Sequence, residues 1–96
     1  MKIETIKKIQ PQLSLKHTGF NIAILFSKEY PLIKIISRRG WEKDFKFLSI
    51  DTNSPYLDNR EKLDQYLQEE REYKSIYLDK DLNEIGSWSE ISKITI

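Results

Sequence analysis

Hydrophobic positions change their spacing near residue 20. Before it, apolar residues recur every three or four positions and end at Pro11, which predicts a short amphipathic helix over residues 2–10, with a strand as the alternative. From residue 20 the period is two, which predicts strands over residues 20–26, 32–37 and 45–51. The turns between these strands are short, so the pattern predicts an antiparallel meander.

Helical spacing returns after the loop at residues 52–55. Asp58 followed by Glu61 is a capping-box arrangement, in which side chains accept hydrogen bonds from the free amides at a helix start. Four apolar residues then mark one face of a predicted helix over residues 59–73: Leu63, Tyr66, Leu67 and Tyr73. Residues 75–79 and 84–90 predict a closing β-hairpin.

The predicted order of elements is therefore α-β-β-β-α-β-β. The fold class expected from it is α+β: one small domain of residues 1–96, mainly antiparallel sheet, with helices packed on one face. A chain of 96 residues has room for one modest core and no second domain.

Composition narrows the possible chemistry. The chain has no cysteine, which excludes disulfides, thiolate catalysis and cysteine-based metal sites. Apolar runs are shorter than the ~18–20 residues of a membrane span, and the start of the chain lacks a signal-peptide pattern, so we expect a cytoplasmic protein. The sequence contains no G-x-S-x-G elbow and no glycine-rich phosphate loop, so we expect no enzyme, no cofactor and no metal site.

The segment with the clearest functional pattern runs from Arg38 to Phe47. It mixes cations with aromatic residues at a predicted hairpin tip, and Arg38, Arg39, Trp41 and Lys43 are the candidate contacts. Trp and Arg are favoured anchors of protein interfaces. Single-stranded nucleic acid is the alternative ligand for residues 34–47, because Lys34, Lys43 and Lys46 could neutralise phosphates while the rings stack on bases. A plain hairpin would use the same residues without binding anything.

A second candidate surface is the acidic outer face of the predicted helix, with Glu61, Asp64, Glu69 and Glu72. It could dock on a basic partner, or it could be an ordinary solvated face. Residues 1–46 carry a net charge of +6 and residues 47–96 carry −5, a split that can steer a partner unless the two halves interleave in the fold.

Three weaker candidates each have a simpler explanation. Asp79, Asp81, Asn83 and Glu90 match the ligand spacing of a calcium loop, but position 6 is Glu84 instead of glycine, and a hairpin turn explains the same residues. His17 has no nucleophile pattern around it and is expected in a loop. Glu70 falls on the apolar helix face, which predicts either a buried carboxylate or a last helical turn that overhangs the core.

The stretch from Phe45 to Trp88, ending YLDKDLNEIGSW, resembles the second half of a thioredoxin-like fold: a strand, a helix and a hairpin. The Cys-x-x-Cys motif of that family is missing. The resemblance therefore implies a redox-inactive scaffold.

Together these patterns predict a small, non-enzymatic regulatory protein that docks on a protein partner. The chain has no valine, one alanine and many isoleucines and lysines, a composition typical of an AT-rich genome. Such a chain would suit a regulator or inhibitor encoded by a phage or mobile element. The patterns leave the oligomeric state open, with a dimer possible through an exposed strand edge.

Overall fold

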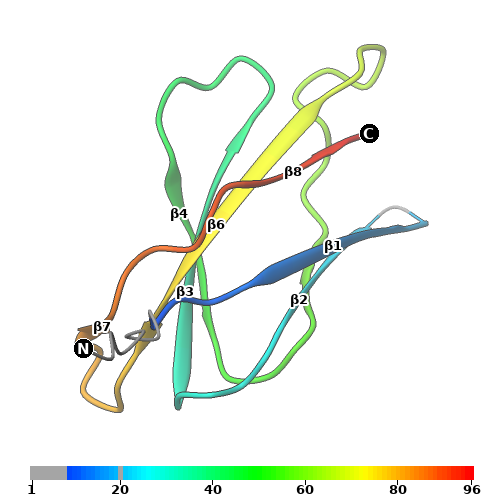
Figure 1. Ribbon diagram of the computed structural model, residues 1–96. Coiled ribbons are helices and arrows are strands. Elements are labelled where there is room, and N and C mark those ends of the chain that lie inside the picture. The colour runs from blue at the N-terminus through cyan, green and yellow to red at the C-terminus, as the bar shows by residue number, and fades with distance from the viewer. Residues whose placement is uncertain (1–8, 20) are drawn as a thin grey trace, which may run out of the picture.

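Strands dominate the structure, a computed structural model that describes residues 9–19 and 21–96 (Figure 1). These residues form eight strands and no helix, so the protein is all-β and the predicted α+β class, with helices packed on a sheet, is wrong. The strands are β1 (Leu13–Thr18), β2 (Asn21–Phe26), β3 (Leu32–Arg39), β4 (Lys46–Asp51), β5 (Tyr56–Asp58), β6 (Glu70–Leu78), β7 (Glu84–Ile85) and β8 (Ser92–Thr95).

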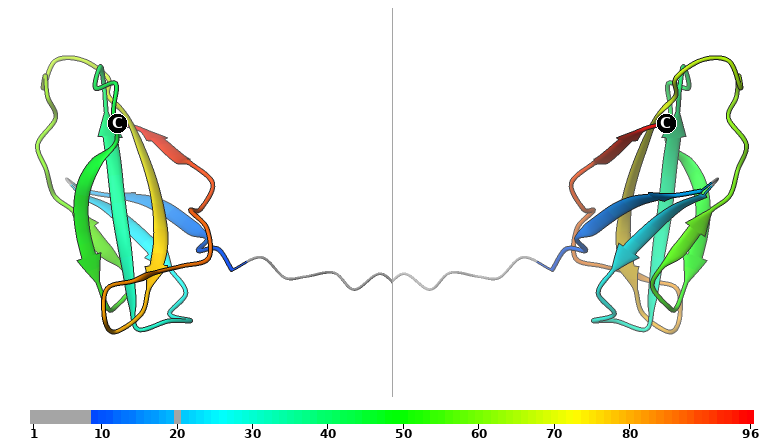
Figure 2. Two further views of the ribbon diagram at one scale, coloured as in Figure 1. Left: turned by 90° about the vertical axis from the view of Figure 1, so that its left-hand side faces the viewer. Right: turned by 90° about the vertical axis from the view of Figure 1, so that its right-hand side faces the viewer.

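The strands form two antiparallel sheets. One has the order β1-β2-β5, and the other has the order β4-β3-β6-β7, with β8 also paired to β6. β7 and β8 pair with opposite ends of β6, as two pieces of one interrupted edge strand. The chain crosses from one sheet to the other after β2, after β4 and after β5. Figure 2 shows the arrangement from two sides.

The predicted meander over residues 20–51 is wrong at its first connection. The strands at 20–26 and 32–37 exist as β2 and β3, but β2 pairs with β1 and β5, whereas β3 pairs with β4 and β6. Each of these two strands has an isoleucine-rich face that must leave water. Placing them in opposite sheets lets the two faces cover each other.

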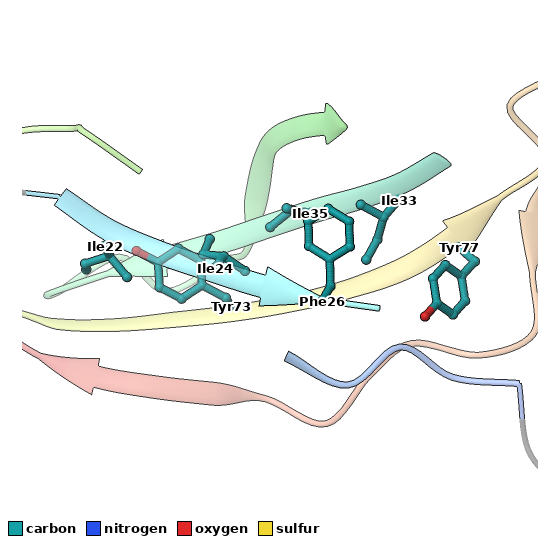
Figure 3. Close-up of a cluster of buried hydrophobic side chains, with 7 residues drawn as sticks. All are labelled: Ile22, Ile24, Phe26, Ile33, Ile35, Tyr73 and Tyr77. Carbon is teal, nitrogen blue, oxygen red and sulfur yellow. The ribbon is translucent and has the colours of Figure 1, made fainter. Parts of the chain in front are cut away.

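The core lies between β2 of the first sheet and β3 and β6 of the second. Figure 3 shows its seven buried side chains pointing toward one another: Ile22, Ile24, Phe26, Ile33, Ile35, Tyr73 and Tyr77. Tyr77 also donates a hydrogen bond to the carbonyl of Ser27 (2.8 Å), which ties the β2–β3 connection to the second sheet. The core thus rests on a few residues of three strands.

The predicted helix over residues 59–73 is wrong. Residues 59–69 form an irregular connection, and the rest of the segment belongs to β6. Buried Arg71, Tyr73 and Ser75 alternate along β6 with the more exposed Glu70, Glu72 and Lys74. The segment forms a strand because its alternating residues fit the core, and this packing outweighs the helical spacing of Leu63, Tyr66 and Leu67.

The predicted N-terminal helix lies almost entirely outside the described residues. Ile9 and Gln10 belong to no regular element, and Leu13 begins β1. Ile9 packs against Gly86, whose φ is +74°: a Cβ there would lie 2.8 Å from the Cβ of Ile9. The amide of Ser87 donates to the Ile9 carbonyl (3.0 Å), so this contact closes the edge of the sandwich and requires glycine.

The predicted closing hairpin is confirmed at its turn. β6 and β7 pair across residues 79–83, where Leu82 has a φ of 69°. β7 ends at Ile85, earlier than the predicted residue 90, because the chain leaves the ladder at Gly86 and returns to β6 as β8. The thioredoxin-like resemblance does not extend to the fold, because residues 45–88 contain no helix.

Candidate functional site

Two connections meet at one end of the sandwich, the upper end in Figure 1. They are residues 40–45, between β3 and β4, and residues 59–69, between β5 and β6. Trp41 of the first is 68% exposed, and Tyr66 and Leu67 of the second are 86% and 55% exposed. We call these three residues the loop-end surface.

Trp41 and Leu67 line the same hollow of about 320 Å³, together with Gly40, Asp64, Gln68, Glu69 and Glu70. Tyr66 lines a second, larger groove of about 1070 Å³ on the residue 59–69 connection. His17, Arg60, Lys62 and Ile96 border that groove. Exposed apolar side chains beside two concave surfaces are a common mark of a macromolecular binding site.

The connection 59–69 is held by a network of buried charges beneath it. Asp58, the last residue of β5, is completely buried and accepts hydrogen bonds from Arg60 Nε and Nη2 (both 2.8 Å) and from the Tyr73 hydroxyl (2.5 Å). Arg71 Nη1 adds a contact of 3.3 Å to the same carboxylate. Since Asp58 belongs to one sheet and Tyr73 and Arg71 to the other, the network joins the two sheets at this end.

The same network reaches the connection itself. Glu69, also buried, accepts from Arg71 Nε (2.6 Å) with one carboxylate oxygen and from the Leu63 amide (2.8 Å) with the other. Arg71 donates in addition to the carbonyl of Arg60 (2.8 Å), and Arg60 donates to the Ser37 hydroxyl of β3 (2.9 Å). An irregular connection of this length is therefore anchored at both of its ends and at its middle.

The electrostatics of the network favour charged Asp58. Burial alone would raise its pKa, but the hydrogen bonds from Arg60 and Tyr73 outweigh burial, and the pKa lies below its ordinary value. Burial and the bond to the Asp58 carboxylate raise the pKa of Tyr73 well above its ordinary value. Asp58 is saturated with donors, and the raised pKa of Tyr73 keeps its hydroxyl protonated, so the network joins a charged carboxylate to a neutral phenol across the two sheets.

Comparison with known proteins gives no relative. No protein-family model, curated protein or solved structure matches the chain. A sandwich architecture carries many unrelated functions, so the function must be argued from the residues of the site.

The basic tip predicted around Arg38 is largely paired within the chain. Arg38 bonds Glu72 on β6 and donates to the carbonyl of Lys43 (2.9 Å), and its guanidinium lies over the Phe45 ring. Arg39 donates to the carbonyl of Glu61 (3.1 Å). The two arginines therefore brace the tip, and Trp41, Lys43 and Asp44 are its exposed side chains.

The predicted acidic face does not form, because there is no helix to carry it. Glu69 is buried against Arg71, and Glu72 is paired with Arg38. Glu61 stays exposed, and Asp64 borders the hollow next to Leu67. The four acidic candidates are thus divided between the interior, the sheet and the connection.

The sheet face that carries Lys34 and Lys74 holds cations and rings in mutual contact. Lys34 and Lys74 lie over the Trp88 ring (5.9 and 5.6 Å), and Lys74 also lies over Phe45 (4.8 Å). Lys34 is further paired with Glu84 (3.5 Å). The Phe45 and Trp88 rings are therefore covered by side chains of the same chain, whereas the Trp41 and Phe47 rings stay exposed.

The weaker candidates have ordinary surroundings. Asp79 accepts from the amides of Asp81 and Asn83 (2.8 and 2.9 Å), the bonding of a hairpin turn. His17 lies exposed on β1, in a strand and not the expected loop. Glu70 is exposed near Lys93, and its neighbour Glu69 is the buried carboxylate. Within the described residues, no cluster of His, Cys, Asp and Glu could hold a metal, and no helix is long and apolar enough to cross a membrane.

Sequence reasoning missed the network and two residues of the loop-end surface. Tyr66 and Leu67 were assigned to a buried helix face, and Asp58 to a helix cap. The available signal was Arg71, a charge in phase with Tyr73, Ser75 and Tyr77 on one alternating face. A charge on such a face predicts a buried acidic partner.

Proposed function

We propose that this protein is a non-enzymatic binding module that docks on another protein through its loop-end surface. The observation that carries the proposal is the combination of Trp41, Tyr66 and Leu67, all mostly exposed, with a connection fixed from beneath by buried ion pairs. Exposing three large apolar side chains costs solubility unless a partner covers them.

Anchoring of the 59–69 connection supports a binding role. The connection is about twice the usual length of about 4–6 residues, and loops positioned by a rigid scaffold often carry binding residues. A loop already held in one conformation loses less entropy when it binds, and so gives more affinity for the same contacts. The Glu69 bond to the Leu63 amide fixes the loop close to Tyr66 and Leu67.

The composition of the surface supports a protein as the ligand. Trp and Tyr dominate the energetic centres of protein interfaces, and polar residues surround them. Here Glu61, Asp64 and Gln68 form such a polar margin. Asp58 has no free oxygen to act as a base, which supports a role without catalysis.

The test is affinity capture of partners from the native host with the wild-type chain and with Trp41→Ala and Leu67→Ala. The captured protein, once purified, should bind Trp41→Ala about 30-fold or more weakly, the loss typical of an anchor residue. Leu82→Ala is the matched control, because Leu82 is similarly exposed (58%) but lies in the turn between β6 and β7, at the other end of β6 from the 59–69 connection. Equal capture by all variants, or no specific partner, would contradict the proposal.

The nucleic-acid alternative has weaker support, since Arg38, Lys34 and Lys46 are paired with acidic side chains. Fluorescence anisotropy with a labelled oligothymidine at low salt separates the two. We expect no binding. Salt-sensitive binding that Lys34→Ala with Lys74→Ala removes would replace the protein-docking proposal. The regulatory, phage-borne role and the cytoplasmic location stay predictions.

A further inference from the structure

Strand β4 presents an open edge of the second sheet. In the described part of the chain it pairs with β3 alone, and Figure 1 shows it at the border of that sheet. Phe47 is 63% exposed and Ile50 is 39% exposed, so the edge carries two large apolar side chains in water. Open edges with apolar residues are templates for pairing with another strand.

A bulge places these two side chains on one face. Phe47 lies opposite Ile36 of β3 and Ile50 lies opposite Lys34, with a register shift between Ile35 and Ile36. Directly opposed residues share a face, and Lys34 and Ile36 lie on the face away from the core. Phe47 and Ile50 therefore share the outer face, although they are three residues apart.

We propose that the occupant of this edge is a second copy of the same chain, paired antiparallel through β4. The sequence KFLSID is complementary to itself when reversed. Lys46 then lies opposite Asp51 of the second copy, Phe47 opposite its Ile50, and Leu48 opposite its Ser49. Opposite charges and apolar pairs directly across two strands both stabilise a sheet.

The faces agree in every pair of this register. Lys46, Ser49 and Asp51 lie opposite the buried β3 residues Ser37, Ile35 and Ile33, so all three share the inner face. Leu48 packs against the core and therefore lies on the inner face too. The outer face holds Phe47 and Ile50. In each pair, the two opposed residues of the two copies therefore lie on the same face of the continuous sheet, as strand pairing requires.

The bulge does not prevent this pairing. A bulged edge strand normally fits a regular strand badly, and proteins use bulges to protect edges. A second copy carries the same extra residue at the same place, and the two-fold axis would pass between Leu48 and Ser49, at the bulge itself. The bulge therefore disfavours pairing of β4 with a regular strand, whereas β4 of a second copy matches it.

The charged pair is free to form. Lys46 is strongly exposed, and its ammonium group donates one hydrogen bond to the Glu42 carboxylate (3.2 Å), which leaves two ammonium protons for another acceptor. Asp51 accepts the Thr52 amide with Oδ1 (2.8 Å), which leaves Oδ2. Because the dimer is symmetric, the Lys46–Asp51 pair occurs twice in it.

Sedimentation velocity over a range of concentrations tests the dimer. The wild type should form a species of twice the 11.5 kDa monomer mass, which dissociates on dilution. Lys46→Asp alone and Asp51→Lys alone should each weaken the dimer about tenfold or more, because two like-charge pairs replace two attractive ones. The double swap should restore it to within about threefold. A monomer at all concentrations, or a double swap no better than the single changes, would overturn the proposal.

Engineered cysteines give a second measurement on exposed positions. The chain has no cysteine of its own, so Phe47→Cys mixed with Ile50→Cys reports on one register. Mild oxidation should link the two different variants faster than it links either variant to itself. Equal rates for all three combinations would contradict the register, and a fast link in a Lys46→Asp background would contradict the role of the charges.

Discussion

Removing the Asp58 carboxylate is the sharpest test of the buried network. In Asp58→Ala the Tyr73 hydroxyl loses its acceptor, and Arg71, almost fully buried, keeps Glu69 as its ionic partner. Arg60 can turn toward water, because it is partly exposed. Breaking a buried ion pair from one side costs about 3–5 kcal/mol. That is a large share of the 5–15 kcal/mol that stabilises a domain.

Two companion variants calibrate this magnitude. Tyr73→Phe keeps the ring in the core and removes one donor to the carboxylate, so we expect a loss of about 1.5–3 kcal/mol. Asp81→Ala removes an exposed carboxylate and should change stability by less than about 0.5 kcal/mol. The order of the three variants therefore follows how completely each leaves a buried charge without its partner.

Urea unfolding followed by tryptophan fluorescence gives the three free energies. The pH dependence adds an independent measure. The pKa of Asp58 is lower in the folded chain than in the unfolded one, so its contribution is complete above about pH 4 and is lost as the pH falls further. Asp58→Ala should flatten this acid-side loss. A destabilisation below about 1 kcal/mol, or an unchanged acid-side slope, would refute the argument.

Three smaller predictions follow from single sites. Ser75→Ala should leave the free energy of unfolding unchanged or raise it, because this buried hydroxyl finds no partner among the described residues. Ser89→Ala should lower it by about 1–3 kcal/mol, because it removes the acceptor of the buried Ser75 amide. Chemical unfolding of the two variants compares these values. Gly86→Ala should lower the melting temperature more than Gly19→Ala, since both have positive φ but Gly86 alone packs against backbone. Tyr73 has a raised pKa, so its stabilisation should be complete below about pH 10 and lost above it, and ultraviolet titration should show one tyrosine ionising only as the chain unfolds.

Alternation of apolar residues located β2, β3 and β4 to within about two residues. The signal is clearest in β2 and β3, where Ile22, Ile24, Ile33 and Ile35 fill the side of the pleat that faces the core. Which strands pair could not be read in the same way. Pairing depends on which faces cover each other across the core, and a local pattern does not contain that information.

The wrong helix has a specific physical origin. Leu63, Tyr66 and Leu67 have helical spacing because they serve a loop and its surface, and Asp58 resembles a cap because it ends a strand beneath two arginines. β6 was obscured by Arg71, a charge on its inner face. A buried charge breaks the hydrophobic pattern on which strand prediction depends, and its two partners, Glu69 and Asp58, lie in an irregular connection and in another sheet.

The charge split between the two halves of the sequence explains why the docking surface moved. β3 of the basic half pairs with β6 of the acidic half, and this register brings Arg38 onto Glu72. Arg38 and Arg39, which predicted a basic tip, are paired within the fold, and paired surface charges contribute little. Trp41 and Lys43 stay exposed at the tip, and Trp41 is the large apolar side chain there. A partner should therefore be selected by an apolar contact, and its binding should respond weakly to salt, in contrast to the steep salt dependence of a phosphate-binding surface.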